Sequence, residues 1–132
     1  PFIQWEQIKK SSENYIRELQ IRPSNTEKHA RNLSGGNQQK VVIAKWLATQ
    51  AKIFIFDEPT RGIDVGAKVE VYRLINSLVS DGAVVIIISS ELPEILGICD
   101  RVLVMNEGEI TADLLKEEAN QEVIMKAATG GM

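Results

Sequence analysis

Two short runs of apolar residues, with a helical pattern between them, limit the folds that this chain can adopt. Residues 53–56 and 83–88 are continuously apolar rather than alternating, which is typical of strands covered on both faces in a parallel sheet. Between the runs, after Asp64, apolar residues recur at helical spacing: Val71, Leu74, Ile75 and Leu78. Gly82 then supplies a stop. The order strand, helix, strand predicts a right-handed β-α-β crossover.

The rest of the chain is predicted to add helices and a hairpin. A surface helix with one buried apolar stripe is expected over residues 5–19. A second helix, capped by Ser34 and largely buried, is expected to end near Gln50. The later elements are predicted by the same patterns: a helix over 91–97, a hairpin of strands 101–105 and 109–114, and a capped helix over 120–128.

Composition excludes several classes of protein. The 132 residues are 44% hydrophobic and 25% charged, which predicts one soluble domain or a piece of one. A net charge of -3 with interspersed signs lacks the basic face of a nucleic-acid binder. The apolar runs are far shorter than the ~20 residues of a membrane span. The single cysteine, Cys99, fits a reducing cytosol and is expected to be a small core residue.

Two carboxylates end the first apolar run. Asp57 and Glu58 follow residues 53–56 directly, at the end of a strand where open parallel sheets build ligand sites. An aspartate at that position can hold Mg²⁺ through water, and the adjacent glutamate can orient an attacking water. The alternative is a solvated strand end before a turn formed by Pro59 and Thr60.

A second candidate site is the glycine pair at the start of the helix that follows Ser34. Gly35 and Gly36 allow close backbone approach, and the helix directs its partially positive end at an anion docked there. The alternative is an ordinary N-cap followed by two flexible glycines. Asp64 also has two interpretations, as a site residue or as the N-cap of the crossover helix.

A phosphate-cradling loop of the form Gly-x-x-x-x-Gly-Lys-Ser/Thr is absent from the sequence. The nearest match, residues 62–69, has the wrong spacing and no hydroxyl at the last position. We therefore expect this chain by itself to bind nucleotide weakly, if at all. The only histidine, His29, is expected to lie on the solvated surface because no second ligand type is near it.

These motifs together resemble the C-terminal part of an ATP-binding-cassette (ABC) ATPase. Residues 33–38 (LSGGNQ) resemble the family signature, and residues 53–58 (IFIFDE) resemble its Walker B strand. Longer strings resemble the second cassette of tandem ATPases that drive import of monosaccharides of the ribose, galactose and xylose type: residues 34–40, 57–68 and 89–94. The likeness runs from about Trp5 to the end of the chain.

The resemblance implies an α/β, P-loop NTPase-like fold, with a mostly parallel sheet flanked by helices and without the Walker A lobe. Residues 1–33 would be part of the helical subdomain. Residues 34–132 would be the C-terminal part of the ATPase core, with signature, Walker B, D-loop and switch region. The phosphate loop and the glutamine loop would lie upstream of Pro1.

The resemblance also implies a role for each motif residue in a site shared by two cassettes. The residues that would contact ATP held by the opposite cassette are Ser34, Gly35, Gly36 and Gln38, with Asp64 as the D-loop aspartate. Asp57 would support Mg²⁺, and Glu58 would be the general base. The cofactors of the complete protein would then be ATP and Mg²⁺, and the chain alone is not expected to hydrolyse ATP.

One departure from the family pattern concerns the switch histidine, whose position is occupied by Ser90. A hydroxyl cannot carry the positive charge that an imidazolium offers the γ-phosphate. The first hypothesis is still the ATPase subunit of a sugar importer. The alternative is a catalytically degenerate cassette that regulates or completes the ATP site of its partner.

The expected partners follow from the same resemblance. They are a second cassette, membrane permease subunits and, indirectly, a periplasmic or extracellular sugar-binding protein, with no nucleic acid. The location would be cytoplasmic, peripheral on the inner face of the membrane. A sheet edge and apolar surface without a neighbouring strand would also favour self-association of the chain.

Overall fold

The structure, a computed structural model, describes residues 3–130. It contains two compact units, divided between Ile86 and Ile87. No helix within residues 3–130 combines the length and the apolar character needed to cross a membrane.

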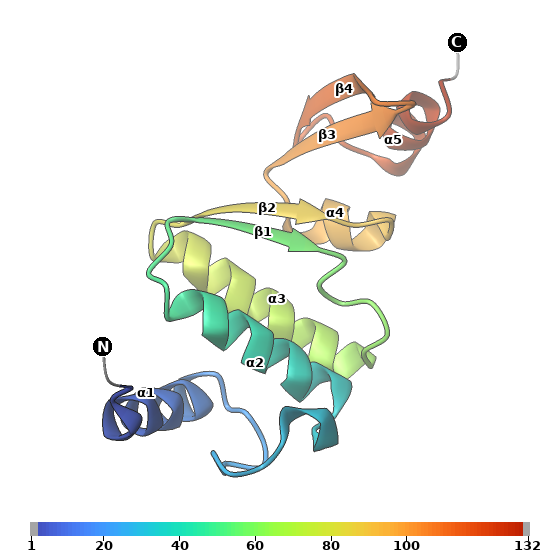
Figure 1. The fold of residues 1–132 in the computed structure, drawn as a ribbon. Helices are drawn as coiled ribbons and strands as arrows, with labels where there is room; N and C mark the ends of the chain where they lie inside the picture. The colour runs from blue at the N-terminus through green and yellow to red at the C-terminus, as the bar shows by residue number, and fades with distance from the viewer. Residues whose placement is uncertain (1–2, 131–132) are drawn as a thin grey trace. The chain divides into compact units, whose positions relative to one another are not determined.

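The first unit contains the predicted crossover. Its elements in chain order are α1 (Trp5–Glu18), the 3-10 turn η1 (Ala30–Asn32), α2 (Gly35–Leu47), β1 (Ile53–Asp57), α3 (Val65–Ser80) and the start of β2 (Val84–Ile88). Strands β1 and β2 pair in a two-stranded parallel sheet, and α3 connects them (Figure 1). The prediction of a β-α-β unit is therefore confirmed. Gly82 follows α3 with φ +89, a conformation that favours glycine.

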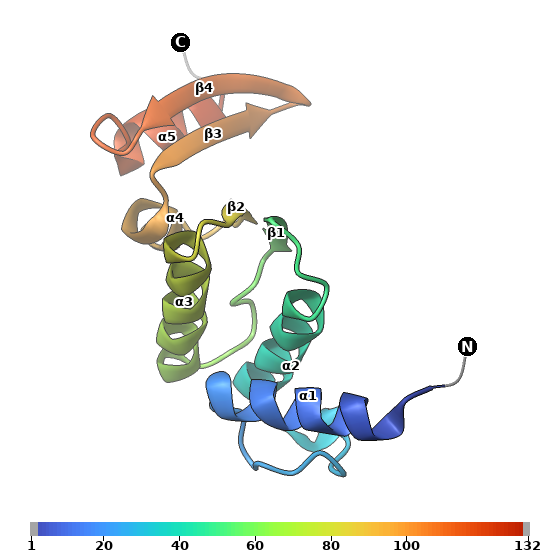
Figure 2. The same ribbon diagram turned by 90° about the vertical axis from the view of Figure 1, so that its left-hand side faces the viewer.

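The core of the first unit lies between its strands and two helices. Helices α2 and α3 run side by side along one face of the β1–β2 pair (Figures 1 and 2). The buried side chains come from α2, β1 and α3, whereas β2 has none in the buried class: Ile43 of α2, Phe54 and Phe56 of β1, and Val71, Ile75 and Leu78 of α3.

The expectation that both faces of the strands are covered is wrong for the described residues. Ile53 and Ile55 of β1 are 62% and 66% exposed, and Ile86 of β2 is 48% exposed. The reason is that helices pack on only one face of the pair, so alternate residues of each strand turn away from them. The sheet therefore presents an apolar outer face.

The helices are also less buried than their apolar patterns suggested. In α2, expected to be largely buried, Val42 and Trp46 are about half exposed, and the buried positions are Gly36, Lys40 and Ile43. In α1, the apolar stripe was expected to be buried, but Trp5 and Ile8 are exposed. Leu19, just after the helix, is buried. No described element packs over the exposed positions.

The second unit confirms the predicted hairpin and capped helix. It contains α4 (Leu92–Ile98), β3 (Arg101–Asn106), β4 (Glu109–Leu115) and α5 (Gln121–Ala128). Strands β3 and β4 are antiparallel, with a register shift between Val104 and Met105. Asn120 caps α5 by accepting a hydrogen bond from the Val123 backbone N–H at 3.0 Å. The core of this unit is formed by Ile95, Val102, Val104 and Ile124.

Candidate functional site

The glycine pair lies where the first turns of α2 and α3 meet. A Cβ atom built on Gly36 would lie 2.4 Å from the Cβ of Ala67, and one built on Gly35 would lie 3.2 Å from Cγ2 of Ile63. Gly36 is buried, whereas Ser34 and Gly35 are exposed. We call Ser34, Gly35 and Gly36 the glycine corner. Close packing requires a glycine at position 36, the space at position 35 is tight, and the outer edge of the corner is open to solvent.

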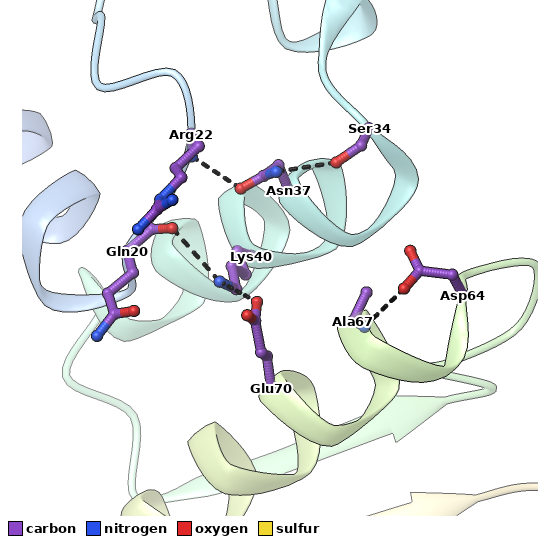
Figure 3. Close-up of polar contacts among 8 residues, drawn as sticks. All are labelled: Gln20, Arg22, Ser34, Asn37, Lys40, Asp64, Ala67 and Glu70. Carbon is purple, nitrogen blue, oxygen red and sulfur yellow. Dashed lines mark hydrogen bonds and ion pairs between the residues drawn. The ribbon is translucent and has the colours of Figure 1, made fainter.

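The side chain of Ser34 does not make the capping bond that the sequence suggested. Ser34 occupies the N-cap position of α2 with extended backbone (φ -61, ψ 156) and makes no side-chain bond to the helix N–H groups. Asn37 Nδ2 instead donates a hydrogen bond to Ser34 Oγ at 2.8 Å, and Asn37 Oδ1 accepts one from the Arg22 backbone N–H, also at 2.8 Å (Figure 3). The hydroxyl is thus held by a side chain of the first turn of α2 rather than by the free N–H groups of that turn.

Gln38 holds the chain that leads into the glycine corner. Its Nε2 donates a hydrogen bond to the Leu33 carbonyl oxygen at 2.8 Å. The residue itself is exposed. A contact between Gln38 and ATP stays a prediction. It would have to be made by the part of the side-chain amide that is not bonded to the Leu33 carbonyl oxygen.

Asp64 caps α3, as one of its two interpretations stated. Its Oδ1 accepts a hydrogen bond from the Ala67 backbone N–H at 3.0 Å (Figure 3). The structure also brings this aspartate to the glycine corner. One open hollow of about 270 Å³ is lined by residues of both helix starts: Ser34, Gly36, Asn37, Asp64, Gly66, Ala67 and Glu70. Asp64 can therefore cap α3 and line the hollow at the same time.

The carboxylate pair lies at the end of β1 but does not line that hollow. Asp57 is the last residue of the strand and is exposed. Glu58 is half-buried and has φ +46, a left-handed conformation that is uncommon and strained for a residue with a side chain. The chain thus leaves the strand through a sharp bend, at the edge where parallel sheets bind ligands.

A complete protein cage for a metal ion is not present in residues 3–130, where no three His, Cys, Asp or Glu side chains cluster suitably. Mg²⁺ does not require one, because it is usually held by one or two carboxylates together with waters and substrate phosphates. The exposed carboxylate of Asp57 at a strand end fits that kind of site.

Ser90 and His29 lie in different parts of the chain. Ser90 follows β2 and is exposed; beside it, the Glu91 backbone N–H donates a hydrogen bond to Ser89 Oγ at 3.1 Å. His29, the only histidine in the sequence, is exposed just before η1, as expected.

Two polar residues near the glycine corner were missed by sequence reasoning. Asn37 bonds to Ser34 as described. Lys40, one turn further along α2, has a side chain only 7% exposed, and its Nζ lies 2.7 Å from Glu70 Oε2 and 3.4 Å from the Gln20 carbonyl oxygen, to which it donates a hydrogen bond (Figure 3). The sequence did contain a signal for these two residues: Asn37 and Lys40 are polar residues three positions apart, on one side of a helix that was expected to be buried.

The perturbed titratable groups of the second unit lie outside the predicted motifs. Burial raises the pKa of the Cys99 thiol, and the charge of Asp100 adds to the effect. The Arg101 guanidinium donates hydrogen bonds to Asp113 at 2.7 and 2.6 Å and lowers the pKa of that carboxyl. Cys99 is therefore a poorly reactive, partly buried thiol, in line with its expected place in the core.

A parallel β-α-β unit with a carboxylate pair at a strand end and a glycine corner opposite a capped helix defines a class, the α/β cassettes of P-loop NTPase type. The family described as ABC transporter matches residues 4–61. The chain is 60% identical over 122 residues to the xylose import ATP-binding protein XylG of Thermoanaerobacter pseudethanolicus. It is 56% identical over 121 residues to the ribose import ATP-binding protein RbsA of Clostridium perfringens.

Each of these alignments covers 92% of this chain but only 24% of the relative, so the chain spans about a quarter of their length. Among solved structures, MJ1267, an ATP-binding cassette of an ABC transporter, superimposes with a TM-score of 0.80. That match covers 96% of this chain and 52% of that one, at 24% identity, and so shows the fold. Residues 4–61 therefore carry part of an ABC transporter domain, and most of the chain is similar to the ATP-binding proteins of sugar importers.

Proposed function

We propose that the chain is part of the ATP-hydrolysing subunit of an ABC importer that couples ATP binding and hydrolysis to sugar uptake. The observation that carries the proposal is the identity of 60% and 56% to proteins named for xylose and ribose import. The chain would contribute the C-terminal part of a second cassette, with residues 1–33 in the helical subdomain and residues 34–132 in the ATPase core.

The glycine corner would act on ATP held by the opposite cassette. Ser34 and Gly35 are exposed, and they stand at the start of a helix of 13 residues, whose free N–H groups and dipole favour an anion. Asp64 lines the same hollow and would reach across the seam between cassettes. Gln38 would support the corner from the preceding loop.

The carboxylates at the end of β1 would serve this cassette's own site. Asp57 would hold Mg²⁺, which neutralises the charge of the ATP phosphates when it is bound. Glu58 would accept a proton from the attacking water and orient it. The strained backbone at Glu58, φ +46, supports a functional role for that residue, since such strain is retained mainly where it is used.

A second function is favoured by one specific observation, the serine at position 90. The sequence has a single histidine, His29, so the switch position carries no imidazole. In this alternative, the cassette is catalytically poor at its own site and acts as a regulatory module that completes the site of its partner through the glycine corner.

The remaining parts of the proposal concern partners and location. We propose that a second cassette and membrane permease subunits are the direct partners, that a sugar-binding protein takes part indirectly, and that the location is cytoplasmic and peripheral to the membrane.

The chain alone would be inactive and would self-associate through the apolar outer face of β1 and β2, where Ile53, Ile55 and Ile86 are exposed. A monodisperse monomer in light scattering at high concentration would contradict self-association.

The test is ATP turnover by the full-length protein with its permease, comparing Glu58→Gln with the native protein. If Glu58 is the base, turnover falls by a factor on the order of 10² to 10⁴. Glu107→Gln is the matched control, because Glu107 is an exposed glutamate with a similar backbone conformation, φ 49. Unchanged turnover in Glu58→Gln would remove this residue from the mechanism and favour the regulatory alternative.

A further inference from the structure

The side-chain amide of Asn37 makes two hydrogen bonds of opposite sense. The Arg22 backbone N–H donates to Asn37 Oδ1, and Asn37 Nδ2 donates to Ser34 Oγ, both at 2.8 Å (Figure 3). A backbone N–H can only donate, so the amide oxygen must face Arg22 and the amide nitrogen must face Ser34. The chemistry of the neighbours thus determines the orientation of the amide.

This orientation decides what the Ser34 hydroxyl can do. A serine hydroxyl has one proton to donate and two lone pairs that accept. The Asn37 N–H occupies one lone pair, so the hydroxyl proton has to point away from Asn37. Within residues 3–130, no acceptor for that proton is recorded, and the residue is exposed. Ser34 is therefore set as a donor toward the solvent side.

The Arg22 N–H that orients Asn37 is itself held in place. The neighbouring Ile21 is 4% exposed and anchors the segment in the core. One turn further along α2 from Asn37, Lys40 Nζ donates to the Gln20 carbonyl oxygen at 3.4 Å. Asn37 and Lys40 of α2 thus both form hydrogen bonds with the backbone of residues 20–22. These bonds hold in place the N–H group that orients the Asn37 amide.

The hollow beside Ser34 also contains two carboxylates, Asp64 and Glu70. Asp64 accepts a hydrogen bond from the Ala67 backbone N–H, and Glu70 is paired with Lys40 at 2.7 Å. These partners reduce the repulsion that the two carboxylates would exert on an anion near the glycine corner.

We propose that Asn37 is a positioning residue, which holds the Ser34 hydroxyl as a hydrogen-bond donor to the terminal phosphate of ATP carried by the partner cassette. The inference rests on the proposed function, because it needs Ser34 to face that phosphate. Asn37 itself need not contact ATP. Its effect on turnover passes through Ser34.

The experiment is a double-mutant cycle on ATP turnover at saturating ATP, in the full-length protein with its permease. Asn37→Asp keeps the acceptor for Arg22 but has no N–H, so the Ser34 hydroxyl donates to the new carboxylate and is lost to the phosphate. We expect turnover to fall by about tenfold or more in Asn37→Asp and in Ser34→Ala. In the Ser34→Ala background, Asn37→Asp should add less than about twofold. The remote control is Asn76→Asp on the exposed side of α3.

Each outcome decides between the proposals. Unchanged turnover in Ser34→Ala contradicts the proposed function of the glycine corner and, with it, the role of Asn37. Reduced turnover in Ser34→Ala with native turnover in Asn37→Asp overturns only the inference on Asn37. Equal losses from Asn37→Asp in both backgrounds also overturn it, because a charge or structural effect would not depend on the Ser34 hydroxyl. If Asn37→Asp does not fold, the same cycle is decided with Asn37→Ala.

Discussion

Replacing Gly36 by alanine tests the contact on which the glycine corner depends. The new Cβ would lie 2.4 Å from the Cβ of Ala67, whereas carbon atoms at their optimal separation are about 3.5–4.0 Å apart. The starts of α2 and α3 would have to separate by about 1 Å or more. Forcing extra atoms into such a contact typically costs about 1–3 kcal/mol.

The same substitution has a second effect, on helix propensity, that would raise the free energy of unfolding. Alanine is preferred to glycine in a helix by up to about 1 kcal/mol, and Gly36 lies in the first turn of α2, where this gain is partial. We therefore expect Gly36→Ala to lower the free energy of unfolding by about 1–2 kcal/mol in net terms.

The assay is urea unfolding at low protein concentration, followed by tryptophan fluorescence and by circular dichroism. Both tryptophans, Trp5 and Trp46, lie in the first unit, so fluorescence reports on the region of the contact. Adding Ala67→Gly removes the obstructing Cβ and should recover part of the loss. Gly97→Ala is the matched control, because a Cβ on Gly97 of α4 meets nothing within 4 Å; it should stabilise by about 0.5–1 kcal/mol in circular dichroism. A Gly36→Ala variant stabilised as much as that control would refute the close contact between α2 and α3.

Three further predictions follow from single contacts. Glu70→Gln should lower the free energy of unfolding by about 1 kcal/mol, because it removes the charged partner of Lys40, whose side chain is 7% exposed, while Glu70 itself is 54% exposed; part of the loss should persist at high salt, and a loss abolished by salt would count against burial of Lys40. The pKa of Asp113 is lowered by Arg101, so stability from this pair is present above the unfolded pKa of the carboxyl and is lost as pH falls through its folded value; Arg101→Gln should raise the Asp113 pKa in an NMR titration, and no change would contradict the pairing. Because burial raises its pKa, Cys99 should react with a thiol reagent at neutral pH more slowly in the folded chain than in urea, and equal rates would show that it is accessible.

The candidate site could be predicted from the sequence in its parts but not in its assembly. Asp57 was placed correctly at a strand end because a short apolar run followed by carboxylates is a local pattern. The glycine corner was placed correctly at a helix start for the same reason. Gln38 was expected near ATP, yet its amide donates to the Leu33 carbonyl. The two alternatives for Asp64 were not exclusive, since it caps α3 and also lines the hollow.

The sequence by itself determined the order of strands and helices in this protein and the location of its motifs, because hydrophobic period, caps and turn residues act over a few positions. Only the tertiary structure decided which groups meet across the chain: Arg22 with Asn37, Gly36 with Ala67, and Lys40 with Glu70. These contacts join residues far apart in sequence, and no local pattern encodes them. The same reason explains the exposed face of β1, since the apolar character of a residue does not reveal whether another element packs over it.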